Sequence, residues 1–153
     1  MINKKIIIII VLFFAISACG YKPIFSLKKN DFYISEIIML GERELDIIIN
    51  NKLKNYKNDT KKLNKYHVTI ESSLNKIISS RDSKGDPSTF TIEINTKLNV
   101  IKNDNIKNEI NFKESFNYAN SSKKFELKQY EKQIKKSLLD NISNNINSYL
   151  QNI

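Results

Sequence analysis

Three consecutive segments of the chain alternate between apolar and polar residues, and this pattern limits the possible folds more than any other feature. The segments run from Tyr66 to Leu74, from Phe90 to Val100 and from Ile106 to Tyr118. A period of two residues is typical of a β-strand that buries only one of its faces. Turn-forming residues fill the two connectors, 80–87 and 102–105. The three segments therefore predict an antiparallel meander with one apolar face.

Two amphipathic segments are available to cover that face. Residues 42–57 and residues 125–150 each place apolar residues every three or four positions, as on one side of a helix. The apolar residues of the first helix are Leu45, Ile48, Ile49, Leu53 and Tyr56. Those of the second are Leu127, Tyr130, Ile134, Leu138, Ile142, Ile146 and Leu150. Ser121 or Ser122 is a suitable N-cap for the second helix.

A short β-branched run from Phe32 to Met39, broken by Gly41, adds a first strand. The predicted order is therefore β-α-β-β-β-α. A sheet with one apolar face must cover that face, and the two helices are the only cover available. The helix between the first two strands permits a crossover, so the first strand can run parallel to its neighbour. We expect an α+β fold in residues 32–153, a two-layer sandwich with a four-stranded mixed sheet covered on one face by two helices.

The N-terminus has the pattern of a bacterial lipoprotein signal. Lys4 and Lys5 precede an unbroken apolar run, residues 6–15, and the tetrapeptide Ile16-Ser17-Ala18-Cys19 follows. A branched aliphatic residue, two small residues and a cysteine form a lipobox. In this interpretation the chain is cut after Ala18 and the thiol of Cys19 is acylated.

Two other interpretations of the N-terminus fit less well. A transmembrane helix needs about 20 apolar residues, and this run extends only from Ile6 to about Ala18. An ordinary secreted protein would be cut at an A-x-A-like site, which Ile16-Ser17-Ala18 resembles less than it resembles a lipobox. We therefore expect a signal peptide in residues 1–18 and a lipidated tether in residues 19–31.

The chain is basic, with 25 Lys and Arg residues against 16 Asp and Glu, and a net charge of +9. The phosphates of lipopolysaccharide or of phospholipid head groups are suitable partners for such a chain on a bacterial envelope. Nucleic acid is not a suitable partner, because a secretion signal directs the chain out of the cytoplasm. Lys, Ile and Asn have A/T-rich codons, so part of the charge can also reflect genome composition on a solvated surface.

No catalytic or metal-binding pattern is visible in the sequence. His67, the one histidine, alternates onto the polar side of its strand, where we expect it to face solvent. Asp82 and Asp86 lie in a hairpin connector, where turn formation explains them without acid–base chemistry. We therefore expect a protein that is not an enzyme and that needs no cofactor or metal.

Three basic residues are candidates for binding an anionic ligand. Arg81 and Lys84 share the connector between the first two alternating segments, and Lys97 lies on the polar face. Such groups form strong, charge-assisted hydrogen bonds to phosphate. Arg81 is one of only two arginines in the chain, and its guanidinium can hold phosphate in a forked geometry. The alternative is that each of these side chains merely solvates the surface.

The run Cys19-Gly20-Tyr21-Lys22-Pro23-Ile24-Phe25 resembles the start of mature LPS-assembly lipoproteins of the LptE family, in particular the alphaproteobacterial type. The later order is similar too, with a Glu-rich start to the first helix and a long hairpin that carries Arg81 near its tip. The aromatic strand ending in Phe116-Asn117-Tyr118 and the terminal helix continue the resemblance.

This resemblance implies a specific role. Such lipoproteins sit in the outer membrane and face the periplasm. They insert as a plug into a β-barrel LPS-assembly protein (LptD-like), help that barrel assemble and help deliver lipopolysaccharide to the cell surface. Arg81, Lys84 and Lys97 would then be candidate lipopolysaccharide-binding residues. The alternative is another periplasm-facing lipoprotein adaptor or anionic-ligand-binding module.

Overall fold

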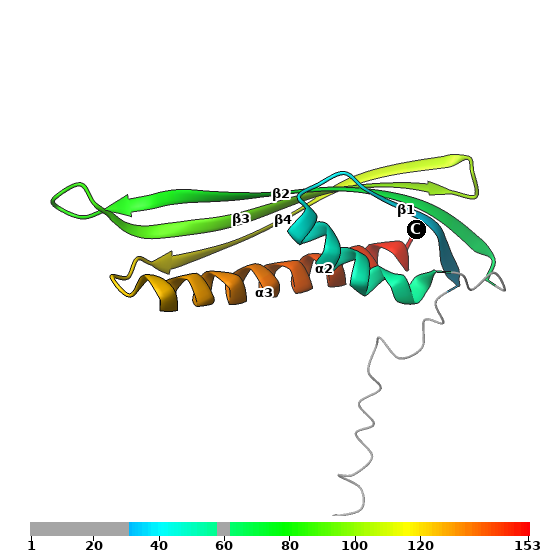
Figure 1. Cartoon of the computed structure of the whole chain (residues 1–153). Helices are drawn as coiled ribbons and strands as arrows, with labels where there is room; N and C mark the ends of the chain where they lie inside the picture. The colour runs from blue at the N-terminus through cyan, green and yellow to red at the C-terminus, as the bar shows by residue number, and fades with distance from the viewer. Residues whose placement is uncertain (1–30, 58–61) are drawn as a thin grey trace, which may run out of the picture.

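The computed structural model describes residues 31–57 and 62–153 and confirms the predicted order of elements. The elements are β1 (Phe32–Met39), α2 (Arg43–Leu53), the 3-10 helix η1 (Lys54–Tyr56), β2 (Asn64–Arg81), β3 (Pro87–Lys102), β4 (Ile106–Ala119) and α3 (Lys124–Leu150). The strands form one sheet, and both helices lie on the same face of it (Figure 1). The predicted signal peptide, Cys19 and the tether as far as residue 30 lie outside the described residues.

The sheet has the strand order β1-β2-β3-β4, with β1 parallel to β2 and the other pairs antiparallel. The crossover through α2 explains the parallel pair, because a hairpin turn can join only antiparallel strands. A β-bulge between Ile34 and Glu36 shifts the register of β1. Phe32 and Ile34 reach the core before the bulge, and Ile37 and Met39 pack against it afterwards.

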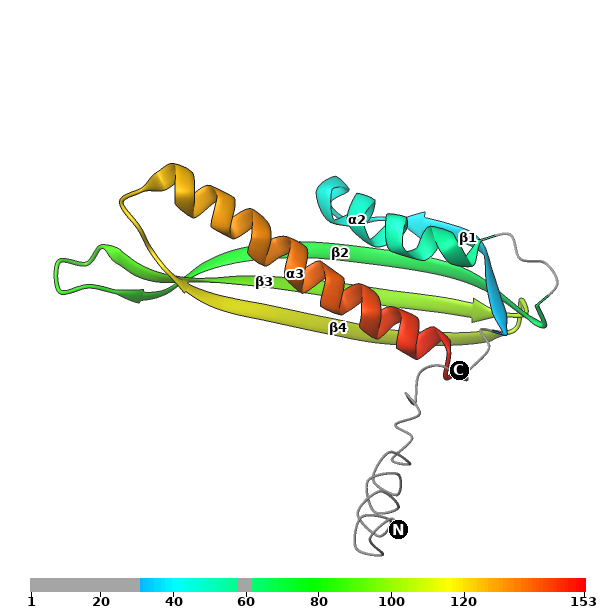
Figure 2. The same ribbon diagram turned by 90° about the horizontal axis from the view of Figure 1, so that it is seen from below.

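β2 is longer than its alternating segment predicts. The alternation ends at Leu74, but the strand continues to Arg81 and pairs with β3 throughout. At 18 residues it extends for about 60 Å. The end of the β2–β3 hairpin projects past the first turn of α3, which crosses the sheet obliquely (Figure 2). Without a helix above them, the last residues of β2 are exposed, and their sequence has no reason to alternate.

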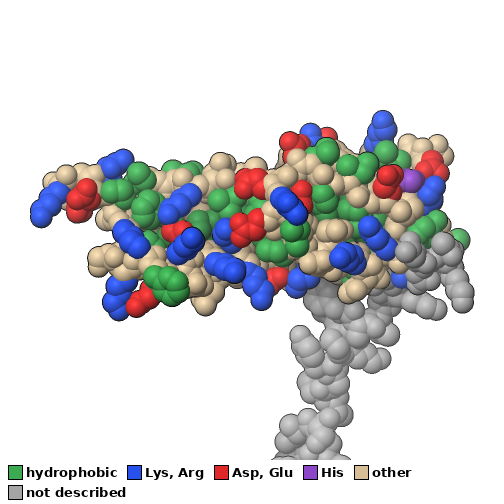
Figure 3. Space-filling view, viewed as in Figure 1, with side chains coloured by type: hydrophobic (Ala, Val, Ile, Leu, Met, Phe, Trp, Pro, Cys, Tyr) green, Lys and Arg blue, Asp and Glu red, His purple; other side chains and the backbone are tan. Residues whose placement is uncertain are grey.

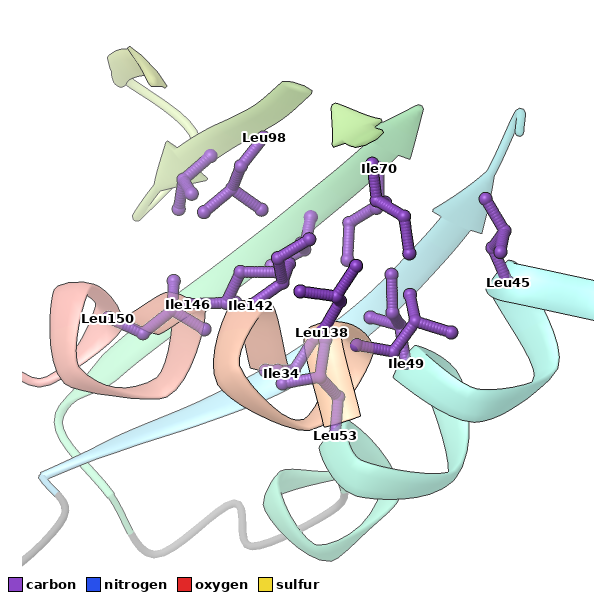
Figure 4. Packing of buried hydrophobic residues seen from close by; sticks show 14 of the residues in the cluster. Ile34, Leu45, Ile49, Leu53, Ile70, Leu98, Leu138, Ile142, Ile146 and Leu150 are labelled. Atoms are coloured by element: carbon purple, nitrogen blue, oxygen red, sulfur yellow. The ribbon is translucent and has the colours of Figure 1, made fainter. Parts of the chain in front are cut away.

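The core lies between the sheet and the two helices. Side chains from α2, including Leu45, Ile49 and Leu53, meet side chains from α3 and from the strands (Figure 4). The buried apolar residues are Phe32, Ile34, Leu45, Ile49, Leu53, Tyr66, Val68, Ile70, Ile92, Ile94, Leu98, Val100, Tyr118, Leu127, Ile134, Leu138, Leu139, Ile142, Ile146 and Leu150. The predicted inward faces of the second and third strands and of the first helix are thereby confirmed.

Both helices differ from the sequence prediction at their ends. α2 ends at Leu53 rather than Lys57, and the chain tightens into η1 before it leaves the layer. The predicted N-cap of α3 is wrong, because Lys123 occupies that position and makes no side-chain capping bond. The Ser121 hydroxyl instead accepts a hydrogen bond from the Lys123 N–H at 3.2 Å. It closes a local turn before the helix, which is the alternative that serine offers to capping.

Candidate functional site: the distal hairpin and the open sheet face

The distal hairpin, residues 75–91, comprises the last part of β2, the tip loop and the start of β3. Backbone hydrogen bonds close its tip, where Asp82 N–H donates to the Asp86 carbonyl at 2.8 Å. The Asp82 carboxylate accepts the N–H groups of Lys84 and Asp86, both at 2.9 Å. Gly85 has a φ of +88°, a region that favours glycine. Turn formation thus accounts for Asp82, as the sequence predicts.

The structure separates the three candidate basic residues. Arg81 and Lys84 are exposed at the tip, and the Arg81 guanidinium donates to the Gly85 carbonyl at 2.8 Å. Lys97 lies opposite Glu71, which is ten residues before Arg81 along β2. That separation corresponds to about 33 Å. Arg81 and Lys84 can therefore meet one ligand together, but Lys97 belongs to another part of the surface.

Several large apolar side chains on the distal hairpin, β4 and the start of α3 are exposed, a feature that the alternation of apolar and polar residues does not predict. Ile77 is 50% exposed and Ile78 is 41% exposed, on opposite faces of the hairpin. Phe116 occupies an apolar position of its alternating segment, and Tyr130 belongs to the apolar face predicted for the second helix, but both are exposed, as is Phe125. These three lie where α3 begins, at the edge of the area that the helix covers. The periodicity of a sequence shows which face of a strand or helix a residue lies on. It does not show where the helical layer that covers this face ends.

A polar network joins the distal hairpin to α3. The Lys76 ammonium lies 2.7 Å from the Glu131 carboxylate, which also accepts the Tyr118 hydroxyl at 2.7 Å. The same ammonium lies 4.4 Å from the centre of the Phe90 ring. Burial acts to raise the pKa of Glu131, but the hydrogen bonds from Lys76 and Tyr118 outweigh it and hold the pKa below its usual value. Burial and the Glu131 carboxylate raise the pKa of Tyr118 far above its usual value.

The open face of the sheet is polar and mixed in charge, as predicted. Lys97 pairs with Glu109 at 2.9 Å, and Lys113 pairs with Glu93 at 2.7 Å, each across β3 and β4. Hydrogen bonds from Lys113 and Asn95 lower the pKa of Glu93. Exposed pairs of this kind contribute little to stability, because water and salt screen them. Their main effect is to make this face suitable for contact with water or with another polar surface.

His67 lies on this polar face but is only partly exposed. Its Nε2 is 2.9 Å from Asp104, and its Nδ1 is 3.4 Å from both Glu36 and the Ser35 hydroxyl. The Ser35 hydroxyl donates to the backbone carbonyl of Tyr66 at 3.0 Å. Its proton is therefore directed away from the imidazole, unlike that of an activated serine nucleophile. Residues 31–57 and 62–153 hold no group of three or more side chains arranged to bind a metal.

A groove between α2 and α3, with a volume of about 610 Å³, collects further basic residues. Two of its lysines are neutralised, Lys135 by Glu44 at 2.9 Å and Lys52 by Asp140 at 3.0 Å. Lys132 and Lys136 also line the groove and have no ion-pair partner among the described residues. Figure 3 shows basic side chains along this side of the molecule and at the hairpin tip. Within the described part of the chain, no helix is long and apolar enough to span a membrane.

Several solved structures with the same arrangement of helices and strands are those of bacterial lipoproteins. Rare lipoprotein B from Shewanella oneidensis has a TM-score of 0.54 at 12% identity, over 77% of this chain and 98% of that one. A minor lipoprotein from Acinetobacter baumannii has a TM-score of 0.57 at 10% identity, over 77% and 90%. Lipoprotein B from Nitrosomonas europaea has a TM-score of 0.50 at 11% identity, over 80% and 84%.

This protein has the fold of these bacterial lipoproteins. No protein-family model matches the sequence, and no curated protein is significantly similar to it. At identities near 10% the likeness concerns the backbone arrangement, so residue roles do not transfer between the chains. The shared fold agrees with an envelope lipoprotein, which is the class that the N-terminal sequence predicts.

Proposed function

We propose that this protein is a periplasm-facing lipoprotein of the outer membrane, anchored through Cys19, that serves the export of lipopolysaccharide. It plugs a β-barrel LPS-assembly protein (LptD-like), assists the assembly of that barrel and helps deliver lipopolysaccharide to the cell surface. The observation that carries this proposal is the fold shared with bacterial lipoproteins, in a chain whose one cysteine closes a lipobox. The protein performs no covalent chemistry in this role and needs no cofactor.

The shape and polarity of the domain support a plug. The sheet is about 60 Å long, and its distal hairpin extends beyond the helical layer (Figure 1). The open face carries ion pairs between β3 and β4. Large outer-membrane barrels have a polar, water-filled interior, which accommodates such a surface. The exposed Arg81 and Lys84 at the hairpin tip suit the phosphates of lipopolysaccharide.

Affinity capture of the tagged protein from detergent-solubilised envelopes tests the proposal. We expect a barrel protein to co-purify in a one-to-one ratio, and we expect depletion of the lipoprotein to lower surface lipopolysaccharide. The matched control is Cys19→Ser, which should release the protein from the membrane fraction while leaving the described domain unchanged. Unchanged surface lipopolysaccharide and unchanged barrel assembly after depletion would exclude the proposed role.

A second candidate function is an anionic-ligand-binding module. The observation that favours it is the groove between α2 and α3, where Lys132 and Lys136 have no ion-pair partner among the described residues and lie beside the apolar side chain of Ile48. This function predicts capture without any barrel, together with binding of anionic lipid that the Lys132→Gln/Lys136→Gln variant loses. The same capture experiment therefore separates the two functions.

A further inference from the structure

One edge of β2 is paired over only part of its length. Next to β1, the Ile70 carbonyl accepts the Leu40 N–H at 2.9 Å, and the Ser72 carbonyl accepts the Glu42 N–H at 3.0 Å. The Leu74 N–H then donates to the side-chain carboxylate of Glu42 at 2.8 Å. At Leu74 the Glu42 carboxylate therefore replaces the backbone carbonyl that a neighbouring strand would supply. The part of the β2 edge that is paired with backbone ends here.

Gly41 explains why the cover ends there. A Cβ at this position would lie 2.4 Å from both the nitrogen and the oxygen of Ser72, so only glycine allows the chain to pass so close to β2. Immediately after this contact the chain turns beneath the sheet and begins α2 at Arg43. The remaining part of the β2 edge receives no strand from the described residues.

Main-chain donors and acceptors continue along this open edge in a regular row. In an antiparallel pair, alternate residues direct their N–H and C=O groups away from the partner strand. The pattern set by Ile70, Ser72 and Leu74 therefore places the N–H and C=O groups of Lys76 and Ile78 on the open edge. None of these four groups has a partner among the described residues. The backbone of another extended strand presents N–H and C=O groups at the same spacing as this row. An unpaired strand edge is therefore a template for the addition of a further strand.

The side chains next to the edge favour the same occupant. Ile77 and Ile78, both substantially exposed, lie on opposite faces of this short stretch. An added strand would cover both, because its own side chains alternate between the two faces. α3 packs on one face of this part of β2, where the Lys76 ammonium lies 2.7 Å from Glu131, whereas the outward N–H and C=O groups lie in the plane of the sheet. Only the end of the hairpin projects past the helix (Figure 2). The β-bulge between Ile78 and Ser80 ends the regular edge and limits the site to Leu74–Ile78.

We propose that the β2 edge from Leu74 to Ile78 binds an extended segment of a partner protein, which joins the sheet in the same row as β1. Strand addition of this kind obtains affinity from main-chain hydrogen bonds and selectivity from the alternate side chains. The excess of Lys and Arg over Asp and Glu, which remains after Lys4 and Lys5 leave with the signal peptide, disfavours a second copy of this chain as the occupant, because like-charged molecules repel. The identification of the partner as the barrel of the LPS translocon rests on the proposed function.

Amide hydrogen exchange at single-residue resolution, in the free lipoprotein and in its purified complex with the barrel, tests this inference. We expect the amides of Lys76 and Ile78 to exchange at least about ten-fold more slowly in the complex, because an added strand protects them. The amides of Asn75 and Ile77, which already face β3, serve as internal controls and should change much less.

Two variants at one position separate the backbone contribution from that of the side chain. Ile78→Pro removes an outward N–H and leaves the β3 ladder intact, whereas Ile78→Ala shortens the side chain and keeps the N–H. The proline variant should bind the barrel about ten-fold more weakly than the alanine variant, the effect of one hydrogen bond. Equal thermal unfolding of both variants excludes misfolding as the cause.

Each alternative result overturns a different part of the inference. A barrel complex with unchanged exchange at Lys76 and Ile78 overturns strand addition and leaves the proposed function standing. Failure to form any barrel complex overturns the proposed function and, with it, the partner named here. Protection of the same amides at high concentration of the lipoprotein alone would identify a second copy as the occupant, contrary to the inference.

Discussion

Ser72 and Thr96 provide a direct test of how polar groups are accommodated between the two layers. They lie opposite each other on β2 and β3, both side chains are buried, and their hydroxyl oxygens are 3.2 Å apart. Ser72→Ala would leave the Thr96 hydroxyl buried without its side-chain partner, which costs about 1–3 kcal/mol. Thr96→Val would do the same to Ser72. The double variant removes both hydroxyls and should be more stable than either single variant.

Urea unfolding of the purified protein measures these differences. With a slope of roughly 2 kcal/mol per molar, a cost of ~2 kcal/mol lowers the midpoint by about 1 M. The double-mutant cycle should therefore show a coupling energy above about 1 kcal/mol. Ser73→Ala on the open face is the matched control and should change the stability by less than about 0.5 kcal/mol. Simple additivity of the two single costs would show that the hydroxyls do not depend on each other.

Three further predictions follow from particular contacts. Gly41→Ala should lower the free energy of unfolding by ~2 kcal/mol or more, because its Cβ would lie 2.4 Å from the backbone of Ser72. Chemical denaturation measures this loss. An unchanged free energy of unfolding would contradict the close approach of Gly41 to Ser72. Glu131→Gln should be less stable than the parent protein at pH 7, and the difference should vanish on acidification. A carboxyl with a lowered pKa stabilises the fold above its unfolded pKa of about 4.3 and loses this effect as the pH falls through its folded pKa. Thermal melts of both proteins at several pH values measure the difference. A difference that does not change with pH would refute the lowered pKa of Glu131. Arg81→Ala should weaken binding to immobilised lipopolysaccharide, with a smaller loss at high salt, while Lys97→Ala should bind normally. Equal losses of affinity in the two variants would contradict the conclusion that Arg81 and Lys97 belong to different parts of the surface.

The sequence predicts this fold well because periodicity reports burial directly. β3 shows the relation most clearly, since every second residue from Ile92 to Val100 is buried beneath the helices. β1 has a less regular pattern, because its bulge transfers the inward side from Ile34 to Ile37. Its boundaries were nevertheless predicted correctly, since Gly41 interrupts the β-branched run that precedes it.

The candidate site was predicted less completely. Arg81 and Lys84 lie together at the hairpin tip as expected, but the distance to Lys97 depends on a strand that continues after its alternation stops. Residues 75–81 show no strand period because all of them are exposed, so neither of their faces must be apolar. The exposure of Phe116 follows from the oblique path of α3, which the spacing of apolar residues on the helix does not specify.

The sequence by itself determined the order of elements, the apolar side of each and the presence of a lipoprotein-type N-terminus. Each of these properties is local, because it depends on residues within a few positions of one another. Only the tertiary structure decided how far the helices cover the sheet and which main-chain groups are left without a partner. Those properties depend on where Gly41 lets the chain leave β2 and where α3 crosses the sheet, and they arise only when distant segments pack together.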